Sequence, residues 1–203
     1  MIAGSRGFFV TKRIFDVVVG VVAIVLTLPV LVACAFAVKI DSRGPIFLVQ
    51  ERTGRHGARF RMYKFRTMVR NAEELKASLA HLNVLPPPDF KIIDDPRITR
   101  VGKFLRKTSL DELPQLVNIV RGEMSLVGPR PTSFSASTYD LWHTQRLEVA
   151  PGITGLWQVK GRNETTFDER LRLDAEYVRS MSFPLDLRIL LWTVRSVVQR
   201  KGA

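Results

Sequence analysis

The chain has 203 residues, which is enough for one domain with its own hydrophobic core. Its 31 lysines and arginines exceed its 19 aspartates and glutamates, and the formal net charge of +12 indicates an anionic partner: nucleic acid, anionic lipid headgroups or a phosphorylated substrate. The single cysteine, Cys34, excludes an intramolecular disulfide, and three scattered histidines, His56, His81 and His143, argue against a zinc site or a Ser-His-Asp triad.

Residues 17–38 form a run of 22 residues without a charge, VVVGVVAIVLTLPVLVACAFAV. Fourteen of them are Val, Ile, Leu or Phe, and uncharged apolar runs of this length are typical of membrane segments. A cleaved signal peptide and a buried helix of a soluble core are the alternatives, although the run is long and no tidy small-residue cleavage site follows it. We expect a membrane unit over residues 1–40 and a second domain over residues 41–203.

Positive charge lies on both sides of this run. The charged residues of the two flanks are Arg6, Lys12, Arg13 and Asp16 before it and Lys39, Asp41, Arg43, Glu51, Arg52, Arg55, Arg59 and Arg61 after it. Because positive flanks favour the cytoplasmic side, a hairpin that enters and leaves on one face satisfies both flanks, whereas a straight span satisfies one. Pro29 removes a helical hydrogen bond near the middle, where the Thr27 hydroxyl can bond a freed carbonyl. The sequence therefore favours a re-entrant helix-break-helix with its kink at Pro29.

The rest of the chain predicts an α+β fold that is mainly α-helical. Two β-rich runs, residues 45–54 and 58–68, are separated by Gly-Arg-His-Gly and read as a short β-hairpin. Residues 71–83 have a helical pattern that ends before three consecutive prolines. Residues 98–107 and 184–202 each predict an amphipathic helix with arginines on the polar face, a type that lies at membrane interfaces. Packing in a soluble core explains either helix alone nearly as well.

The stretch TSLDELPQLVN, residues 108–118, places an aspartate and a glutamate side by side ahead of a proline. Ser-x-x-Glu is a common helix-opening pattern, but a cap at Ser109 would put Pro114 at the fifth helical position, where its ring meets a carbonyl one turn back. A cap at Asp111 puts Pro114 at the third position, which is tolerated. We expect the helix to begin at Asp111 or a neighbour. Adjacent Asp111 and Glu112 then point about 100° apart and do different work rather than share one proton.

Arginines close to this helix start indicate a phosphate site. Arg106 lies upstream, the turn Gly128-Pro129-Arg130-Pro131 holds a second arginine downstream, and helix N-termini bind anions. A carboxylate among phosphates and arginines serves either as a ligand for Mg²⁺ or as a nucleophile that forms an acyl phosphate. A salt-bridge network at an ordinary helix start is the alternative, which the spacing does not exclude.

Residues 95–131, DPRITRVGKFLRKTSLDELPQLVNIVRGEMSLVGPRP, resemble the signature of the bacterial sugar transferases, the small monotopic phosphoglycosyl transferases. Further matches follow in the family's order, at residues 12–16 (KRIFD), 44–54 (GPIFLVQERTG), 63–68 (YKFRTM), 151–163 (PGITGLWQVKGRN) and 173–178 (LDAEYV). Two details depart from the pattern: Glu123 stands where many members have aspartate, and the prolines at 86–88 are unusual. No multi-helix region precedes the match, so the chain is similar to the family's small form.

The resemblance implies a reaction and a location. Members move a sugar 1-phosphate from a UDP-sugar to polyprenyl (undecaprenyl) phosphate through a covalent aspartyl sugar-phosphate, and they release UMP. This is the first membrane step of polysaccharide or glycoconjugate assembly, such as exopolysaccharide or lipopolysaccharide. The resemblance further implies Mg²⁺ as cofactor and a monotopic catalytic domain, here residues 41–203, on the cytoplasmic face of the bacterial inner membrane. Trp157 is a pointer to a hexose, whereas the glycan, the acceptor length and the oligomeric state, a homodimer included, stay open.

The resemblance also assigns roles to residues. Asp111 matches the nucleophile, and Glu112 matches the residue that serves Mg²⁺ and the proton. Arg106 matches the phosphate-binding arginine, and Arg130 matches the arginine of the Gly-Pro-Arg-Pro motif, another anion contact. The remaining matches near the nucleotide and the active site are Lys64, Gln158, Arg162 and Asp174.

Two other functions compete with an enzyme. A nucleic-acid-binding protein fits the net charge and the basic and aromatic residues of 58–68, but it leaves residues 17–38 and the Asp111-Glu112 pair without a purpose. A catalytically inactive membrane scaffold is the second, and the intact pair together with Arg106 argues against it. We expect a transferase whose partners are a UDP-sugar, polyprenyl phosphate and membrane lipids, with no nucleic acid.

Overall fold

The structure is a computed structural model that describes residues 6–85, 89–135, 137, 140–161 and 166–199. Its helices are α1 (Arg6–Asp41), α2 (Glu74–Ser78), α3 (Arg100–Thr108), α4 (Gln115–Arg121), α5 (Leu156–Lys160), α6 (Phe167–Ser180) and α7 (Phe183–Val198). Its strands are β1 (Phe47–Thr53), β2 (Arg59–Phe65), β3 (Ser125–Val127) and β4 (Gly152–Thr154). Short 3₁₀ segments are η1 (Arg55–Gly57), η2 (Ala80–Leu82), η3 (Leu110–Glu112) and η5 (Leu141–Glu148). The mainly helical α+β prediction is confirmed.

The predicted hairpin is confirmed, and a second small sheet accompanies it. Strands β1 and β2 pair antiparallel, with Phe47 opposite Phe65 and Thr53 opposite Arg59. Strands β3 and β4 pair in parallel, with Ser125 opposite Gly152. The sequence did not predict β3 and β4, because strands of three residues are too short to show an alternating pattern. The helix predicted over residues 71–83 is shorter, and consists of α2 followed by η2.

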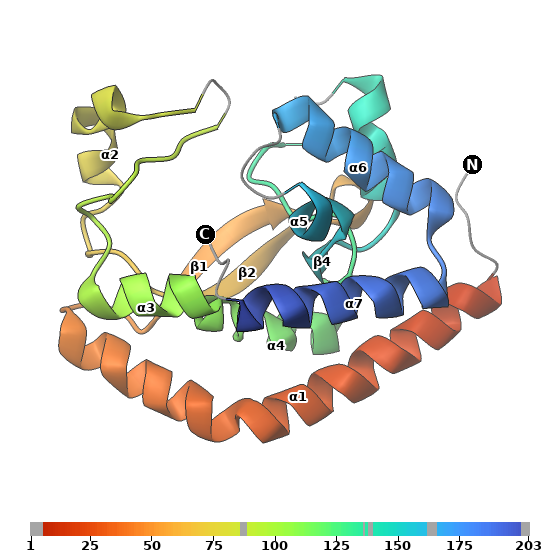
Figure 1. The fold of residues 1–203 in the computed structure, drawn as a ribbon, viewed down its shortest axis with the longest axis horizontal. Coiled ribbons are helices and arrows are strands. Elements are labelled where there is room, and N and C mark those ends of the chain that lie inside the picture. Colours follow the sequence, from red (N-terminus) through yellow and green to blue (C-terminus); the bar gives the residue numbers. More distant parts are fainter. Residues whose placement is uncertain (1–5, 86–88, 136, 138–139, 162–165, 200–203) are drawn as a thin grey trace.

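Helix α1 has the length and composition of a membrane segment, and little of its most apolar stretch is buried. Figure 1 shows it bent midway, with both arms rising toward the rest of the protein. The expected break at Pro29 is wrong, since the helix continues through this residue. The Thr27 hydroxyl donates to the Ala23 carbonyl at 2.6 Å, not to the Val25 carbonyl that Pro29 leaves without an N–H donor. Such a bond one turn back itself bends helices, so Thr27 adds to the effect of proline.

The N-terminal arm of α1 is attached by its charged residues. Arg13 donates to the carbonyls of Ile119 and Val120 at the end of α4, at 2.6 and 2.7 Å. Lys12 forms an ion pair with Asp186 of α7 at 2.6 Å, and the buried Asp16 accepts a 2.7 Å hydrogen bond from the Ser125 hydroxyl. These residues, which the sequence analysis counted as a membrane flank, fasten the anchor to the body of the protein.

The C-terminal arm of α1 is attached at the other end of the same body. Cys34 and Val38 are buried with Phe65 of β2 and Leu105 of α3 in a small apolar cluster. Asp41 at the end of the helix accepts the backbone N–H of Val101 at 3.1 Å. Both ends of α1 therefore meet one globular unit, and the bend points away from it (Figure 1).

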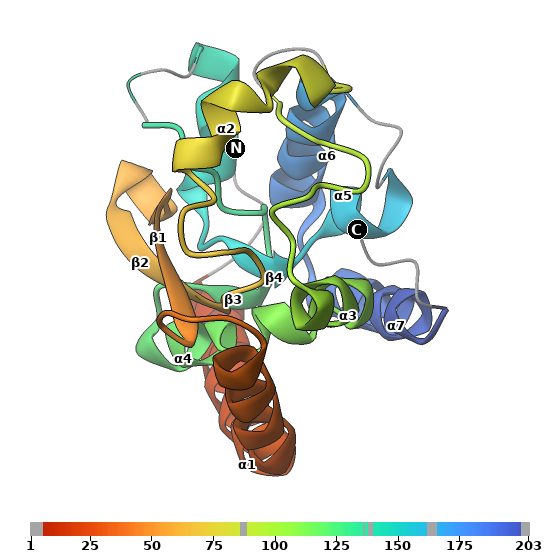
Figure 2. The same cartoon turned by 90° about the vertical axis from the view of Figure 1, so that its left-hand side faces the viewer.

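Helices α3, α4 and α7 lie beside α1, whereas α2 and α6 lie on the far side of the protein in both views (Figures 1 and 2). Large apolar side chains are exposed along the near side; those of α1 include Val25, Leu26, Val32, Phe36 and Ile40, and those of α3 and α7 include Phe104, Leu187, Leu191, Trp192 and Val194. The two predicted amphipathic helices are thus present, and their exposed apolar residues extend the apolar surface of α1.

Candidate active site

The Asp111-Glu112 pair lies in the 3₁₀ turn η3, between α3 and α4. Ser109 ends α3 with a left-handed backbone (φ 57°), and η3 closes with hydrogen bonds from Glu112 N to Ser109 O and from Leu113 N to Leu110 O. The helix start expected at Asp111 or a neighbour is divided in two: the 3₁₀ turn begins at Leu110, whereas the α-helix α4 begins at Gln115, directly after Pro114. Proline lacks the N–H that an α-turn across this point would need, so 3₁₀ hydrogen bonds form ahead of it.

Glu112 is held by two cations. Lys64 Nζ lies 2.9 Å from its Oε1, and Arg130 donates to Oε1 at 2.6 Å and to Oε2 at 3.4 Å. Burial by itself would raise the pKa of Glu112, but the charges of Arg130 and Lys64 outweigh it and hold the pKa far below its ordinary value. Glu112 is therefore a permanently ionised carboxylate that joins strand β2 to the Gly-Pro-Arg-Pro turn.

Asp111 has neither the ion-pair partners nor the lowered pKa of Glu112. It is 8% exposed, and its carboxylate accepts no hydrogen bond from any residue in the described part of the chain. Burial and the adjacent Glu112 raise its pKa, while Lys64, Arg106 and Arg130 act in the opposite direction, and burial is the largest of these effects. A carboxylate with this combination is available for attack or for a metal ion, and less strongly solvated than a surface aspartate.

Arg106 approaches the pair from α3. Its Nε donates to the hydroxyl of Thr67 at 2.9 Å, and burial lowers its pKa while Asp111 and Asp95 raise it. The close packing of α3 on the strand end depends on Gly102, where a Cβ atom would lie 2.0 Å from the Thr67 carbonyl. Any side chain at Gly102 would therefore push Arg106 away from the site.

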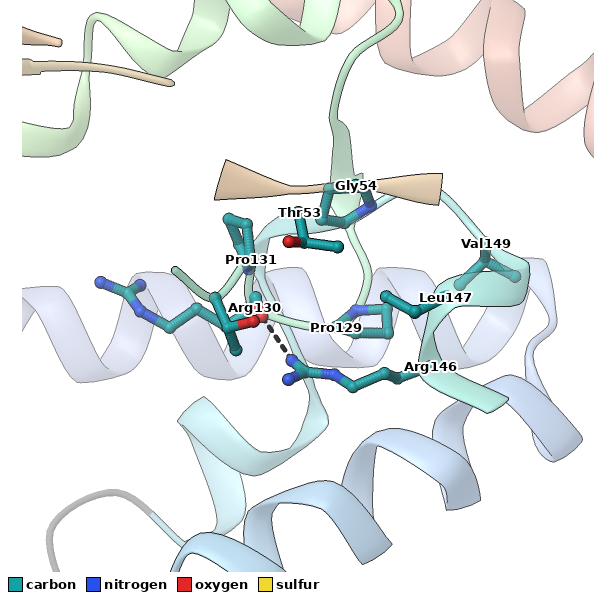
Figure 3. A pocket seen from close by; sticks show the side chains of 10 residues that line it. Thr53, Gly54, Pro129, Arg130, Pro131, Arg146, Leu147 and Val149 are labelled. Atoms are coloured by element: carbon teal, nitrogen blue, oxygen red, sulfur yellow. Dashed lines mark hydrogen bonds between the residues drawn. The ribbon is translucent and has the colours of Figure 1, made fainter. Parts of the chain in front are cut away.

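Arg130 is oriented from behind by Arg146, a residue of η5 that the sequence analysis did not single out. The Arg146 guanidinium donates to the Arg130 carbonyl, while the Arg130 side chain extends in the opposite direction (Figure 3). Arg146 also pairs with Asp174 of α6 at 2.7 Å, and both side chains are buried. Burial raises the pKa of Asp174 to about 6 against the opposing charges of Arg146 and Arg170. Arg130, Arg146 and Asp174 are far apart in the sequence, and no motif spacing predicts that they contact one another.

The structure brings Lys64, Arg106, Arg130, Asp111 and Glu112 together and places the other predicted residues differently. Asp174 pairs with Arg146, which contacts the Arg130 carbonyl, and it lines the cleft described below rather than the Asp111-Glu112 turn. Gln158 lies on α5, where its Nε2 donates to the Ile153 carbonyl at 3.3 Å. Arg162 lies outside the described residues.

A cleft of about 740 Å³ begins at Arg106 and Arg130 and extends toward α2 and α6. This volume is in the range of sites for cofactor-sized ligands. Its lining is rich in arginine and aromatic side chains: Arg52, Arg97, Arg146, Arg170, Phe90, Phe134, Trp157 and Phe167. Of these, Arg52 and Arg146 are the residues most relevant to the site that sequence reasoning missed, and the only signal for Arg52 was its place in the QERTG stretch.

The residues at the pair are compatible with Mg²⁺. The described residues contain no group of three or more His, Cys, Asp and Glu side chains that could enclose a metal ion. Mg²⁺, however, keeps several waters and is usually bound by one or two carboxylates together with substrate phosphates. Asp111, which accepts no hydrogen bond from the described residues, and the Oε2 atom of Glu112, whose one contact is 3.4 Å long, leave room for such binding.

The chain is similar to several named bacterial proteins. It is 44% identical to the undecaprenyl-phosphate galactose phosphotransferase of Salmonella typhimurium and 45% identical to the UDP-galactose-lipid carrier transferase of Erwinia amylovora, over 95% of the chain in each case. It spans 41% of the length of each of these relatives. It is also 39% identical to the exopolysaccharide production protein ExoY of Sinorhizobium fredii, over 96% of the chain and 88% of that protein.

The model of the bacterial sugar transferase family matches residues 8–200, which include the anchor helix, the hairpin, the Asp111-Glu112 turn and the arginines around it. The resemblance seen in the sequence motifs is thus confirmed over almost the whole chain. The protein belongs to the bacterial sugar transferase family.

Proposed function

We propose that the protein is a phosphoglycosyl transferase that moves a sugar 1-phosphate from a UDP-sugar to polyprenyl phosphate and releases UMP. The observation that carries this proposal is the contrast within one turn: a buried Asp111 without hydrogen bonds from the described residues, beside a Glu112 neutralised by Lys64 and Arg130. The names of the relatives, an undecaprenyl-phosphate galactose phosphotransferase and a UDP-galactose-lipid carrier transferase, support the same reaction.

The chemistry proceeds in two displacements at one phosphorus atom. In the first, a carboxylate oxygen of Asp111 attacks the β-phosphorus of the UDP-sugar, and the bond from that phosphorus to the bridging oxygen breaks. UMP leaves with the bonding electrons, and an aspartyl sugar-phosphate remains. In the second, an oxygen of polyprenyl phosphate attacks the same phosphorus, the bond to Asp111 breaks, and the carboxylate is restored.

The residues around Asp111 suit both steps. Negative charge moves from the carboxylate to the leaving phosphate, and Arg106, Arg130 and Lys64 stand where they offset it. Mg²⁺ bound through Glu112 would supply further charge compensation on the diphosphate. Lys64 and Arg130 both contact Oε1 of Glu112, which makes this carboxylate a weaker nucleophile than Asp111.

The membrane arrangement follows from the same geometry. The two ends of α1 meet one globular unit while the bend points away from it, which supports a re-entrant, monotopic anchor rather than a full span (Figure 1). The apolar residues of α1, α3 and α7 then face lipid, and the cleft faces the cytoplasm on the far side. In this proposal a soluble donor and a lipid acceptor reach Asp111 from two sides at the inner membrane, as the first membrane step of glycan assembly requires.

One experiment tests the proposal directly. The detergent-solubilised protein is incubated with Mg²⁺ and, separately, UDP-galactose, UDP-glucose and UDP-N-acetylglucosamine, without acceptor, and analysed by intact mass and UMP release. We expect a sugar-phosphate adduct on the wild-type protein and on Asp94→Asn, a control that changes an exposed aspartate. Asp111→Asn should give neither adduct nor UMP. Normal turnover by Asp111→Asn would show that the nucleophile is another residue.

A further inference from the structure

The cations that line the cleft differ in whether a carboxylate balances them. Seven side chains are involved: Arg52, Lys76, Arg97, Arg106, Arg130, Arg146 and Arg170. Five form ion pairs, namely Lys76 with Glu73, Arg97 with Asp95, Arg130 with Glu112, Arg146 with Asp174 and Arg170 with Asp89. Within the described residues, Arg52 and Arg106 alone of the seven have no carboxylate within ion-pair distance. Their charges are therefore available to an anion that enters the cleft.

Arg106 is the arginine that the family resemblance already links to phosphate, whereas nothing in the sequence motifs gave Arg52 a role. Arg52 projects from β1, and its Nη2 donates to the neutral side chain of Gln50 at 2.8 Å. Its Nε is buried and has no hydrogen-bond partner among the described residues. A buried donor of a charged group without a partner is costly, so a missing acceptor is the simplest physical reason for it.

The charges around Arg52 also indicate that an anionic partner is missing. Burial lowers the pKa of its guanidinium, and the like charges of Arg130 and Arg59 lower it further, with only Glu112 opposing them. Arg130 and Lys64 already bind Glu112, and Arg59 already pairs with Glu51 at 3.3 Å, so neither carboxylate is left to balance Arg52. An anion placed between these guanidinium groups would relieve the repulsion.

We infer that Arg52 binds a phosphate of the nucleotide diphosphate donor, on the UMP side, and stabilises the charge that develops there as UMP leaves. This inference rests on the proposed function. The donor is favoured over the lipid phosphate because the cleft that Arg52 lines runs toward α2 and α6, away from the apolar surface of α1 (Figures 1 and 2). A lipid acceptor approaches from that apolar surface. Arg52 therefore acts in the first displacement, together with Arg106.

The test compares three variants of the full-length, detergent-solubilised protein. Arg52→Met removes the charge and keeps the length of the side chain, and Arg52→Lys keeps the charge without the planar fork. Arg61→Met is the matched control: it removes the same charge from the neighbouring strand, on an exposed side chain outside the cleft. The measurements are calorimetric binding of UDP with Mg²⁺, the thermal midpoint, the rate of UMP release without acceptor, and the transfer of preformed adduct to polyprenyl phosphate.

Arg52→Met should weaken UDP binding and slow UMP release by about tenfold or more, as expected for lost hydrogen bonds to a charged group. Arg52→Lys should recover part of this loss, and Arg61→Met should match the wild type. The thermal midpoint of Arg52→Met should stay unchanged or rise, because an uncompensated repulsion is removed. If Arg52 only stabilised the fold, Arg52→Met would lower the thermal midpoint and leave UDP binding unchanged. That result overturns the inference.

Two further outcomes distinguish acceptor binding by Arg52 from a failure of the proposed function. If Arg52→Met forms the adduct normally but transfers it slowly to polyprenyl phosphate, the arginine binds the acceptor, and the inference is wrong. If the wild-type protein releases no UMP from any UDP-sugar, the proposed function fails, while UDP binding by the variants still decides the role of Arg52.

Discussion

Arg130 and Glu112, 18 residues apart in sequence, form an ion pair with 2.6 Å between Nη2 and Oε1. The pair connects the Gly-Pro-Arg-Pro turn to the turn that carries Asp111, and Lys64 joins it at 2.9 Å. Two adjacent carboxylates thereby acquire opposite properties: the pKa of Glu112 is lowered by its partners, and the pKa of Asp111 is raised by burial. This difference in pKa and in bound partners is the physical reason for proposing Asp111 as the nucleophile and Glu112 as the Mg²⁺ ligand.

Replacing Glu112 by Gln should reduce both stability and activity. The isosteric amide leaves the partly buried Lys64 and Arg130 without their counter-charge, and a lost hydrogen bond to a charged group costs about 1.5–3 kcal/mol. We expect a lower thermal midpoint together with a loss of UMP release. Adding Lys64→Met to Glu112→Gln should restore part of the midpoint and none of the activity. A midpoint equal to that of the wild type in Glu112→Gln would show that the two cations need no partner.

Arg130→Lys should behave almost like Arg130→Met. Arginine reaches both oxygens of Glu112, at 2.6 and 3.4 Å, with one planar group, and an ammonium group cannot reproduce that geometry. Steady-state kinetics of UMP release should show a fall in kcat/KM of about tenfold to a hundredfold for both variants. Activity close to the wild type in Arg130→Lys would mean that charge alone is needed at this position.

The acidic limb of the pH profile should lie above the range of an ordinary aspartate. Asp111 must be ionised to attack, and its raised pKa means that protonation begins at a higher pH as the solution is acidified. Lys64 opposes this rise, so Lys64→Met should shift the limb of kcat/KM for UMP release to still higher pH. A shift to lower pH would contradict the assignment of the limb to Asp111.

Arg146→Met should be rescued by a second substitution, Asp174→Asn. The single change leaves Asp174 buried without its partner, while the double variant leaves no buried charge. The pKa of Asp174, already raised to about 6, would rise further in Arg146→Met. Because the folded-state pKa lies above the unfolded value, stability is retained at low pH and lost as pH rises through the folded pKa. Thermal midpoints at pH 5 and 8 should therefore differ more for Arg146→Met than for the double variant.

Both flanks of α1 should be accessible from the same side of the membrane. In a Cys34→Ser background, Arg6→Cys and His56→Cys introduce thiols at exposed positions that precede and follow the anchor in the sequence, the second in the turn of the hairpin. We expect an impermeant thiol reagent to label both in inverted membrane vesicles and neither in right-side-out vesicles. Labelling of the two positions from opposite sides would establish a full span and contradict the re-entrant arrangement.

The sequence by itself determined the secondary-structure elements that depend on residues close together in the chain. The 22-residue apolar run, the hairpin and the two amphipathic helices are visible as composition and periodicity, and the motif around Asp111 and Glu112 is contiguous in the chain. The family match over residues 8–200 follows from the same contiguous motifs.

The tertiary structure decided what depends on residues far apart in sequence. The helix start was predicted at Asp111 or a neighbour; a 3₁₀ turn does begin at Leu110, but the α-helix begins only at Gln115, after Pro114. Lys12, Arg13 and Asp16, which the sequence shows only as charges before the apolar run, make internal contacts to α7, α4 and β3. The charge balance of the cleft, which leaves Arg52 and Arg106 without carboxylate partners among the described residues, emerges only once ion pairs between distant segments are formed. Local hydrogen bonding and hydrophobic periodicity depend on residues that are close in sequence. Ion pairing depends on which distant segments come into contact in the folded protein.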